Sequence, residues 1–105
     1  MIVNLEDGRR LIFLFDYFDG NVILRSTRLQ EMRRITRCRT LLNTSNDSQS
    51  GIPLSCGLAF CNPKDQFVRR TGRKISLTRA LYEANFPKEI RRQVWQTFLY
   101  TIEKE

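Results

Sequence analysis

Within Cys61-Asn62-Pro63-Lys64-Asp65-Gln66-Phe67-Val68-Arg69-Arg70-Thr71-Gly72-Arg73-Lys74-Ile75, strand-like sequence gives way to helix-like sequence. Asparagine is a favoured helix N-cap, and proline is favoured in the first helical position. A carboxylate three residues after the cap can accept hydrogen bonds from free backbone N–H groups. Asn62, Pro63 and Asp65 therefore predict that a helix begins at Asn62.

The sequence before this point predicts five β-strands, because runs rich in β-branched and aromatic residues are separated by short polar stretches. The predicted strands are residues 1–5, 10–18, 22–24, 35–42 and 52–60. The polar stretches 6–9 and 19–21 predict turns, and 43–51 predicts a mobile loop. Residues 27–34 fit either a helical turn or a connection, so they receive no assignment.

The sequence after Asn62 predicts two helices. The first extends to about Ala84, where Asn85 and Phe86 interrupt the pattern, and the second follows Pro87. Strands followed by helices predict an α+β fold, with an antiparallel sheet of about five strands and two C-terminal helices packed on it. No linker divides the chain, so residues 1–105 are expected to form a single domain.

Two features indicate more apolar surface than one sheet and two helices would cover. Residues 11–15 are continuously apolar, which is typical of a strand covered on both faces. The first predicted helix is apolar on two sides and is therefore expected to be sandwiched. These features predict a homo-oligomer, a dimer or higher, although the central strand of a monomer would explain the apolar run equally well.

Residues 52–60 alternate bulky and small side chains, with Pro53, Ser55, Gly57 and Ala59 on the small side. A small face allows another backbone or a flat ligand to approach closely. Packing of the following helix against this face is the simpler interpretation.

Charge and residue types restrict the function. Eighteen Lys and Arg against eleven Asp and Glu give a formal net charge of +7, so an anionic partner is expected. The chain has three cysteines and no histidine. This composition disfavours a histidine-based catalytic triad and the usual zinc ligand sets, so we expect a protein that is not an enzyme and that needs no metal or cofactor.

Arg69, Arg73 and Ser76 share one stripe of the predicted helix near its positive end. Two guanidinium groups, backbone N–H groups and a hydroxyl suit a phosphate, so a ligand pocket is predicted at the strand-to-helix switch. These residues would otherwise be the solvated face of the helix. A second hypothesis is a nucleic-acid-binding module, in which scattered arginines form a continuous track along phosphates. That track would comprise Arg33, Arg34, Arg37, Arg39, Arg69, Arg70, Arg73 and Arg91.

The segment 57–67, with Arg69, Gly72, Arg73, Ile75 and Arg79-Ala80-Leu81, resembles a recurrent pattern in small phage and prophage proteins. Among these, the chain is similar to the phage Thoeris anti-defence sponges, which capture cyclic ADP-ribose signals. The resemblance implies a non-catalytic homo-oligomer that sequesters a nucleotide second messenger, of cyclic ADP-ribose type or a cyclic oligonucleotide, for immune evasion. It implies ligand-binding roles for aromatic, Asn and Arg side chains, and the positions that could fill them are Asn62, Phe67, Arg69, Arg73 and Arg91.

Other possibilities are the nucleic-acid-binding module or a phage inhibitor of a host protein. The N-terminus lacks the pattern of a signal peptide, and no apolar run is long enough to span a membrane. A cytoplasmic location is therefore expected, in the host cell if a phage encodes the chain.

Overall fold

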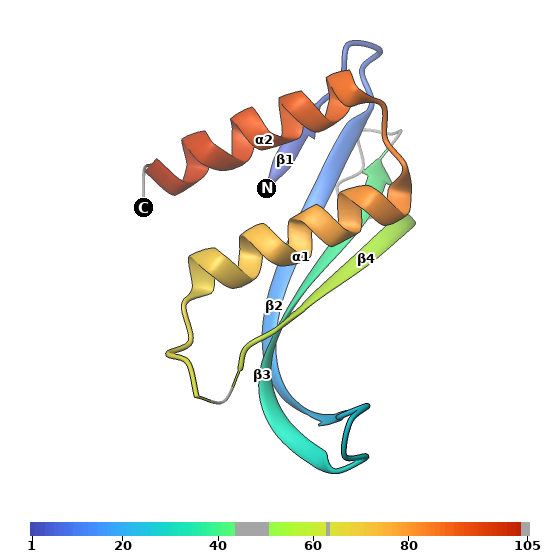
Figure 1. Ribbon diagram of the computed structural model, residues 1–105. Coiled ribbons are helices and arrows are strands. Elements are labelled where there is room, and N and C mark those ends of the chain that lie inside the picture. Colours follow the sequence, from blue (N-terminus) through green and yellow to red (C-terminus); the bar gives the residue numbers. More distant parts are fainter. Residues whose placement is uncertain (44–50, 63, 104–105) are drawn as a thin grey trace.

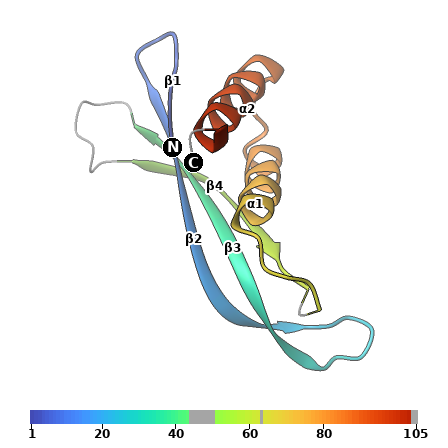
Figure 2. The same ribbon diagram turned by 90° about the vertical axis from the view of Figure 1, so that its left-hand side faces the viewer.

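The computed structural model describes residues 1–43, 51–62 and 64–103. Its elements are β1 (Ile2–Asn4), β2 (Arg10–Ile23), β3 (Gln30–Asn43), β4 (Ile52–Phe60), α1 (Arg69–Ala84) and α2 (Lys88–Glu103). The strands form one antiparallel sheet in sequence order, and both helices lie on one side of it (Figures 1 and 2). The predicted α+β class is confirmed, with four strands in the described part of the chain instead of five.

The predicted turn at residues 19–21 is wrong, because β2 continues through it without interruption. Asp19 binds Arg34 across the ladder at 3.3 Å. Gly20 leaves room for Ile35, since a Cβ atom at Gly20 would lie 2.8 Å from Ile35 Cδ1. The chain reverses instead between Leu24 and Leu29, so the unassigned residues 27–34 supply the end of this turn and the start of β3.

The segment from Asp19 to Arg34 forms a two-stranded ribbon that we call the β-arm. It extends beyond the rest of the sheet, because the pairing of β4 with β3 covers only the β3 residues from Ile35 to Leu42. Figure 2 shows the β-arm bending toward the side of the sheet that carries the helices. The β-arm therefore borders the same side of the molecule as the beginning of α1.

Helix α1 occupies the small face of β4, as the simpler interpretation of that strand predicts. A Cβ atom at Gly57 would lie 2.5 Å from the backbone nitrogen of Ala80 and closer still to the carbonyl oxygen of Ser76. Only glycine allows two backbones to approach this closely. Gly57 therefore sets how deeply α1 sits on the sheet.

The core lies between the sheet and the helices. Phe13 on β2, Leu77 on α1 and Val94 on α2 are at most 1% exposed and belong to one buried cluster. On the opposite face of the sheet, Leu14 is 39% exposed. Within one chain the helices therefore cover one face of β2, and the cover predicted for its other face in a homo-oligomer stays a prediction.

The predicted start of the first helix is also wrong. The helix begins at Arg69, with Val68 in the N-cap position, and not at Asn62. The Asn62 side chain accepts a hydrogen bond from the Lys64 N–H at 3.0 Å, so it stabilises a turn instead of a helix. The C-terminal end at Ala84 is confirmed, because Asn85 adopts a left-handed conformation with φ 55°.

The second apolar side predicted for α1 is not covered within one chain, because Ile75 is 39% exposed and Val68, which precedes α1, is 48% exposed. The predicted loop 43–51 falls largely outside the described residues, as does Pro63.

The three cysteines are free. Cys38 is buried, and this burial raises the pKa of its thiol to about 12. Neither α1 nor α2, over the residues described, is long and apolar enough to cross a membrane.

Candidate functional site

A pocket of about 190 Å³ lies at the strand-to-helix switch. Its walls come from β3, the end of β4, the connection between β4 and α1, and the first turns of α1. The lining residues are Thr36, Ala59, Phe60, Cys61, Asn62, Asp65, Gln66, Phe67, Val68, Thr71, Gly72 and Ile75. The structure therefore brings two predicted site residues, Asn62 and Phe67, into one cavity.

The floor of the pocket carries a buried hydroxyl. Thr36 is 1% exposed, and its Oγ1 atom has no hydrogen-bond partner among the residues that the structure describes. Gly72 of α1 lies directly over it, since a Cβ atom there would come within 3.1 Å of Thr36 Cβ. Buried hydroxyl groups are normally hydrogen-bonded. Thr36 thus offers a polar contact to a molecule that enters the pocket.

A pair of aromatic rings lies beside the pocket, with one arginine guanidinium against each ring. The Arg34 guanidinium lies 5.3 Å from the centre of the Phe67 ring, which meets the Tyr17 ring edge to face at 6.0 Å. The Arg69 guanidinium lies 5.0 Å from the centre of the Tyr17 ring. We call Arg34, Phe67, Tyr17 and Arg69 the aromatic ladder. Such surfaces can stack unpaired bases and attract phosphates.

Two members of the aromatic ladder, Tyr17 and Arg34, are absent from the predicted site. The alternation of β2 contained the signal for Tyr17, because residues 13, 15 and 17 of one strand share a face. Phe13 and Phe15 lie on the helix side, and Phe15 packs against Phe98 of α2 at 6.3 Å between ring centres. Arg34 could not be placed while residues 27–34 had no assignment.

The N-terminus of α1 is unusually basic. Its first six residues include Arg69, Arg70, Arg73 and Lys74, and its first turn has no acidic residue. Val68 provides no side-chain cap. The first backbone N–H groups of a helix lack intrahelical partners, and the helix dipole makes this end positive. Cations at this end add to the positive potential, which favours binding of an anion.

The predicted arginine stripe is only partly formed. Arg69 is exposed and contacts Tyr17, but Arg73 is half-buried and does not line the pocket. Ser76 is fully buried, and its hydroxyl donates to the Arg73 carbonyl oxygen at 3.2 Å. The Ser76 hydroxyl is therefore unavailable to a phosphate, because residue 76 faces the sheet. Arg91 lies in the first turn of α2, which runs back along α1, so it is far from the pocket (Figure 1).

The arginines of the hypothetical nucleic-acid track lie on two faces of the sheet. Arg34 belongs to the helix side, whereas Arg33 and Arg37 alternate to the other side. Arg37 binds the Asp16 carboxylate through Nε at 3.1 Å, and Arg33 binds Glu31 at 2.9 Å. The Arg37 guanidinium also holds the pKa of the Asp16 carboxyl below its usual range. These pairs are separated from the pocket by the sheet itself.

The pocket has few groups that could act as a catalyst. The Cys61 thiol lies 3.5 Å from the Asn62 carbonyl oxygen and 3.8 Å from that of Asp65, and it donates to these backbone acceptors. Asp65 is the one carboxylate among the lining residues. The described part of the chain contains no group of three or more His, Cys, Asp or Glu residues placed to hold a metal ion.

Comparison with known proteins adds no relative on which a function could be based. The chain matches no protein-family model, no curated protein and no solved structure.

Proposed function

We propose that this protein binds a nucleotide without transforming it. The base enters the pocket, and a phosphate binds at the N-terminus of α1 beside Arg69. The observation that carries the proposal is the buried Thr36 hydroxyl, which has no partner among the described residues and lies in a pocket bordered by an uncapped, basic helix end. The Thr36 hydroxyl inside the pocket can bind the base of a nucleotide, and the positive potential at its border can bind the phosphate.

The size of the pocket supports one base per site. A volume of about 190 Å³ is below the roughly 300 to 1,000 Å³ of most small-molecule sites. A single aromatic ring system can enter, stack on Phe67 and reach Thr36, while the sugar and phosphate remain outside. There they would be close to Arg69, whose guanidinium is held by Tyr17. The side-chain amides of Asn62 and Gln66 would contact the edge of the base.

The resemblance to phage sponges supports cyclic ADP-ribose and cyclic oligonucleotides as ligands, and a counter-defence role through their sequestration. Such ligands carry both a base and phosphates, as the site requires. A nucleotide within a strand of nucleic acid has the same chemistry. An assay that measures the affinity of the protein for each of these ligands identifies the one that it binds most tightly.

Calorimetry against AMP, cyclic AMP, cyclic ADP-ribose and a cyclic dinucleotide tests the proposal. We expect binding of at least one of these, and a ten- to hundredfold loss of affinity in Arg69→Ala, because a charge-assisted hydrogen bond contributes about 1.5 to 3 kcal/mol. Arg91→Ala removes the same charge from the far end of the helical layer and should change the affinity less than twofold. Absence of binding to every ligand, or equal losses in both variants, would refute the pocket.

The face of the sheet opposite the helices leads to a separate prediction. We propose that a second copy of the chain covers it, because several large apolar side chains are exposed on this face and exposed apolar patches mark interaction sites. These include Ile2 (52%), Leu14 (39%), Phe18 (37%) and Phe60 (42%). Pairing through the edge of β4 is disfavoured, since the Arg79 guanidinium binds the Leu58 carbonyl there at 2.6 Å.

Light scattering is expected to give at least twice the chain mass of 12.5 kDa. Leu14→Lys should reduce the mass to that of a monomer, because a buried, unpaired charge is costly at an interface. Leu99→Lys is the matched control, since Leu99 is 56% exposed on α2, away from this face. A wild-type protein that is monomeric at micromolar concentration would contradict this prediction.

A further inference from the structure

We infer that the natural ligand is a single strand of nucleic acid that begins in the pocket and continues along the β-arm. This inference rests on the proposed function and specifies its ligand. The pocket holds one base, so the rest of a longer ligand must lie on the adjoining surface. The β-arm provides that surface, since it bends toward the side of the sheet that carries the helices (Figure 2).

The β-arm is continuous with the aromatic ladder. Arg34, at the base of the β-arm, lies against Phe67 of the pocket wall. The ladder of β2 and β3 pairs every residue without a break from Tyr17 to Ile23. Residues 19, 21 and 23 therefore share the face of Tyr17, as do residues 30, 32 and 34 on β3. At about 3.3 Å per residue, the distance from Tyr17 to Ile23 is about 20 Å, enough for several nucleotides.

The side chains on this face suit unpaired bases. Asn21 and Gln30 are exposed and carry amides that can both donate and accept hydrogen bonds at base edges. Met32 is 58% exposed and Ile23 is 65% exposed, which gives apolar contacts next to those amides. Single-stranded nucleic acid presents unstacked bases to such surfaces, whereas a duplex keeps its bases stacked and could not place one in the pocket.

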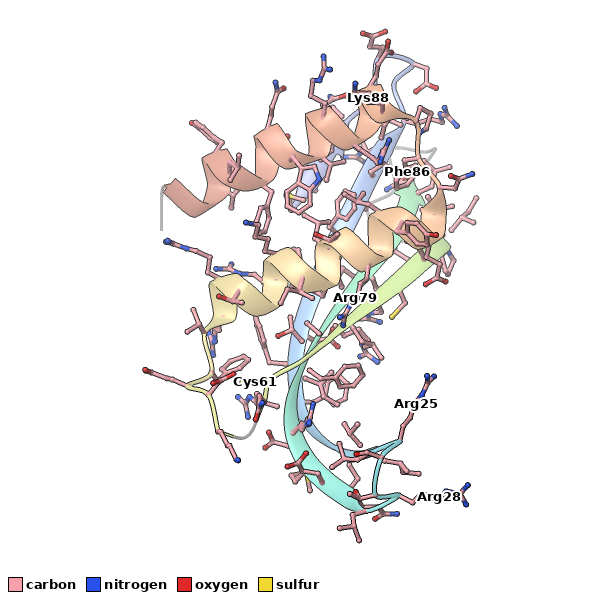
Figure 3. All side chains as sticks on the ribbon, viewed as in Figure 1. Arg25, Arg28, Cys61, Arg79, Phe86 and Lys88 are labelled. Carbon is pink, nitrogen blue, oxygen red and sulfur yellow. The ribbon has the colours of Figure 1, made fainter. Side chains whose placement is uncertain are left out.

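The charge of the β-arm also fits a polyanion. Its two acidic residues are already paired, Asp19 with Arg34 and Glu31 with Arg33. Arg25 and Arg28 at the tip have no acidic partner among the ion pairs of the described residues, and both point away from the ribbon (Figure 3).

The turn at the tip holds Arg28 in an uncommon backbone conformation. Its φ is 57°, a value that is rare for residues other than glycine, asparagine and aspartate. The Arg28 N–H donates to the Leu24 carbonyl oxygen at 2.7 Å, and the Leu29 N–H donates to Thr27 Oγ1 at 3.3 Å. This hydrogen-bonded turn carries the two tip arginines at the end of the β-arm that is opposite Arg34. Phosphates of one strand can therefore be bound at both ends of the β-arm.

Fluorescence anisotropy with labelled 12-nucleotide DNA and RNA single strands, a 12-base-pair DNA duplex and competing mononucleotides tests the inference. We expect a single strand to bind at least tenfold more tightly than a mononucleotide or the duplex. The double variant Arg25→Ala/Arg28→Ala should bind the single strand about tenfold more weakly and leave mononucleotide affinity unchanged. The slope of log affinity against log salt should fall by about 1.4, as expected for two lost phosphate contacts on a single strand.

Arg91→Ala/Arg92→Ala is the matched control, because it removes the same charge from an exposed part of α2. It should change single-strand affinity less than twofold. Equal losses in the two double variants would indicate diffuse charge attraction and overturn the inference. If a mononucleotide or cyclic nucleotide binds as tightly as any single strand, the β-arm is not part of the site and the proposed function stands alone. If neither strands nor nucleotides bind, both proposals fail.

Discussion

Gly57→Ala is expected to destabilise the native fold severely. The added methyl group would lie 2.5 Å from the Ala80 nitrogen and closer to the Ser76 carbonyl oxygen, and both atoms belong to the backbone of α1. A helix backbone cannot rotate away as a side chain can, so α1 would have to move off the sheet. That movement would separate the buried Leu77 and Leu81 from the sheet side of the core. We expect a loss of more than about 4 kcal/mol, against a total stability of about 5 to 15 kcal/mol for a small domain.

Urea unfolding followed by circular dichroism measures this effect. Gly20→Ala is the matched control, because it adds the same methyl group to a strand glycine whose nearest neighbour is the terminal Cδ1 atom of Ile35 at 2.8 Å. A side-chain end can change rotamer, so the control should lose about 1 kcal/mol or less. Similar unfolding midpoints for Gly57→Ala and the wild type would show that α1 does not approach β4 as described.

Gly72→Ala is expected to destabilise the fold and to block the pocket. In an unobstructed helix, alanine is more favourable than glycine by about 1 kcal/mol. Here the new methyl group would lie 3.1 Å from Thr36 Cβ and closer to Thr36 Oγ1. Overpacking of this kind typically costs about 1 to 3 kcal/mol. The methyl group would also occupy the pocket above the Thr36 hydroxyl, so nucleotide affinity should fall at least tenfold.

Adding Thr36→Ala to Gly72→Ala distinguishes the effect on stability from the effect on nucleotide binding. It removes the Oγ1 atom that obstructs residue 72, so the double variant should recover part of the lost stability, with a coupling energy of about 0.5 to 3 kcal/mol. It also removes the hydroxyl proposed to contact the base, so nucleotide affinity should stay low. Additive stability effects would contradict the packing of Gly72 on Thr36, and recovered affinity would contradict the role of the hydroxyl.

Residue types that favour helix ends predicted a boundary correctly where the side chain had no other hydrogen-bonding role. Asn85 ends α1 because asparagine tolerates a left-handed conformation, and Pro87 precedes the next helix. At Asn62 a similar local signal was misleading. Its side chain forms a turn with Lys64, and the chain up to Val68 places Phe67 between Arg34 and Tyr17 before the helix begins. The Asn62 side chain is used in that turn, so it does not cap the helix.

The sequence by itself determined the α+β class, the order of strands and helices, the bounds of the last strand at residues 52–60 and the small face of β4. These depend on residue patterns within single elements, which local sterics and alternation control. The aromatic ladder was decided only by the tertiary structure, because residues 17, 34, 67 and 69 come from three separate segments. These residues meet because β2 continues through Gly20 and because Gly57 lets α1 lie close to the sheet. Both features set distances between separate elements, and a pattern within one element contains no information on such distances.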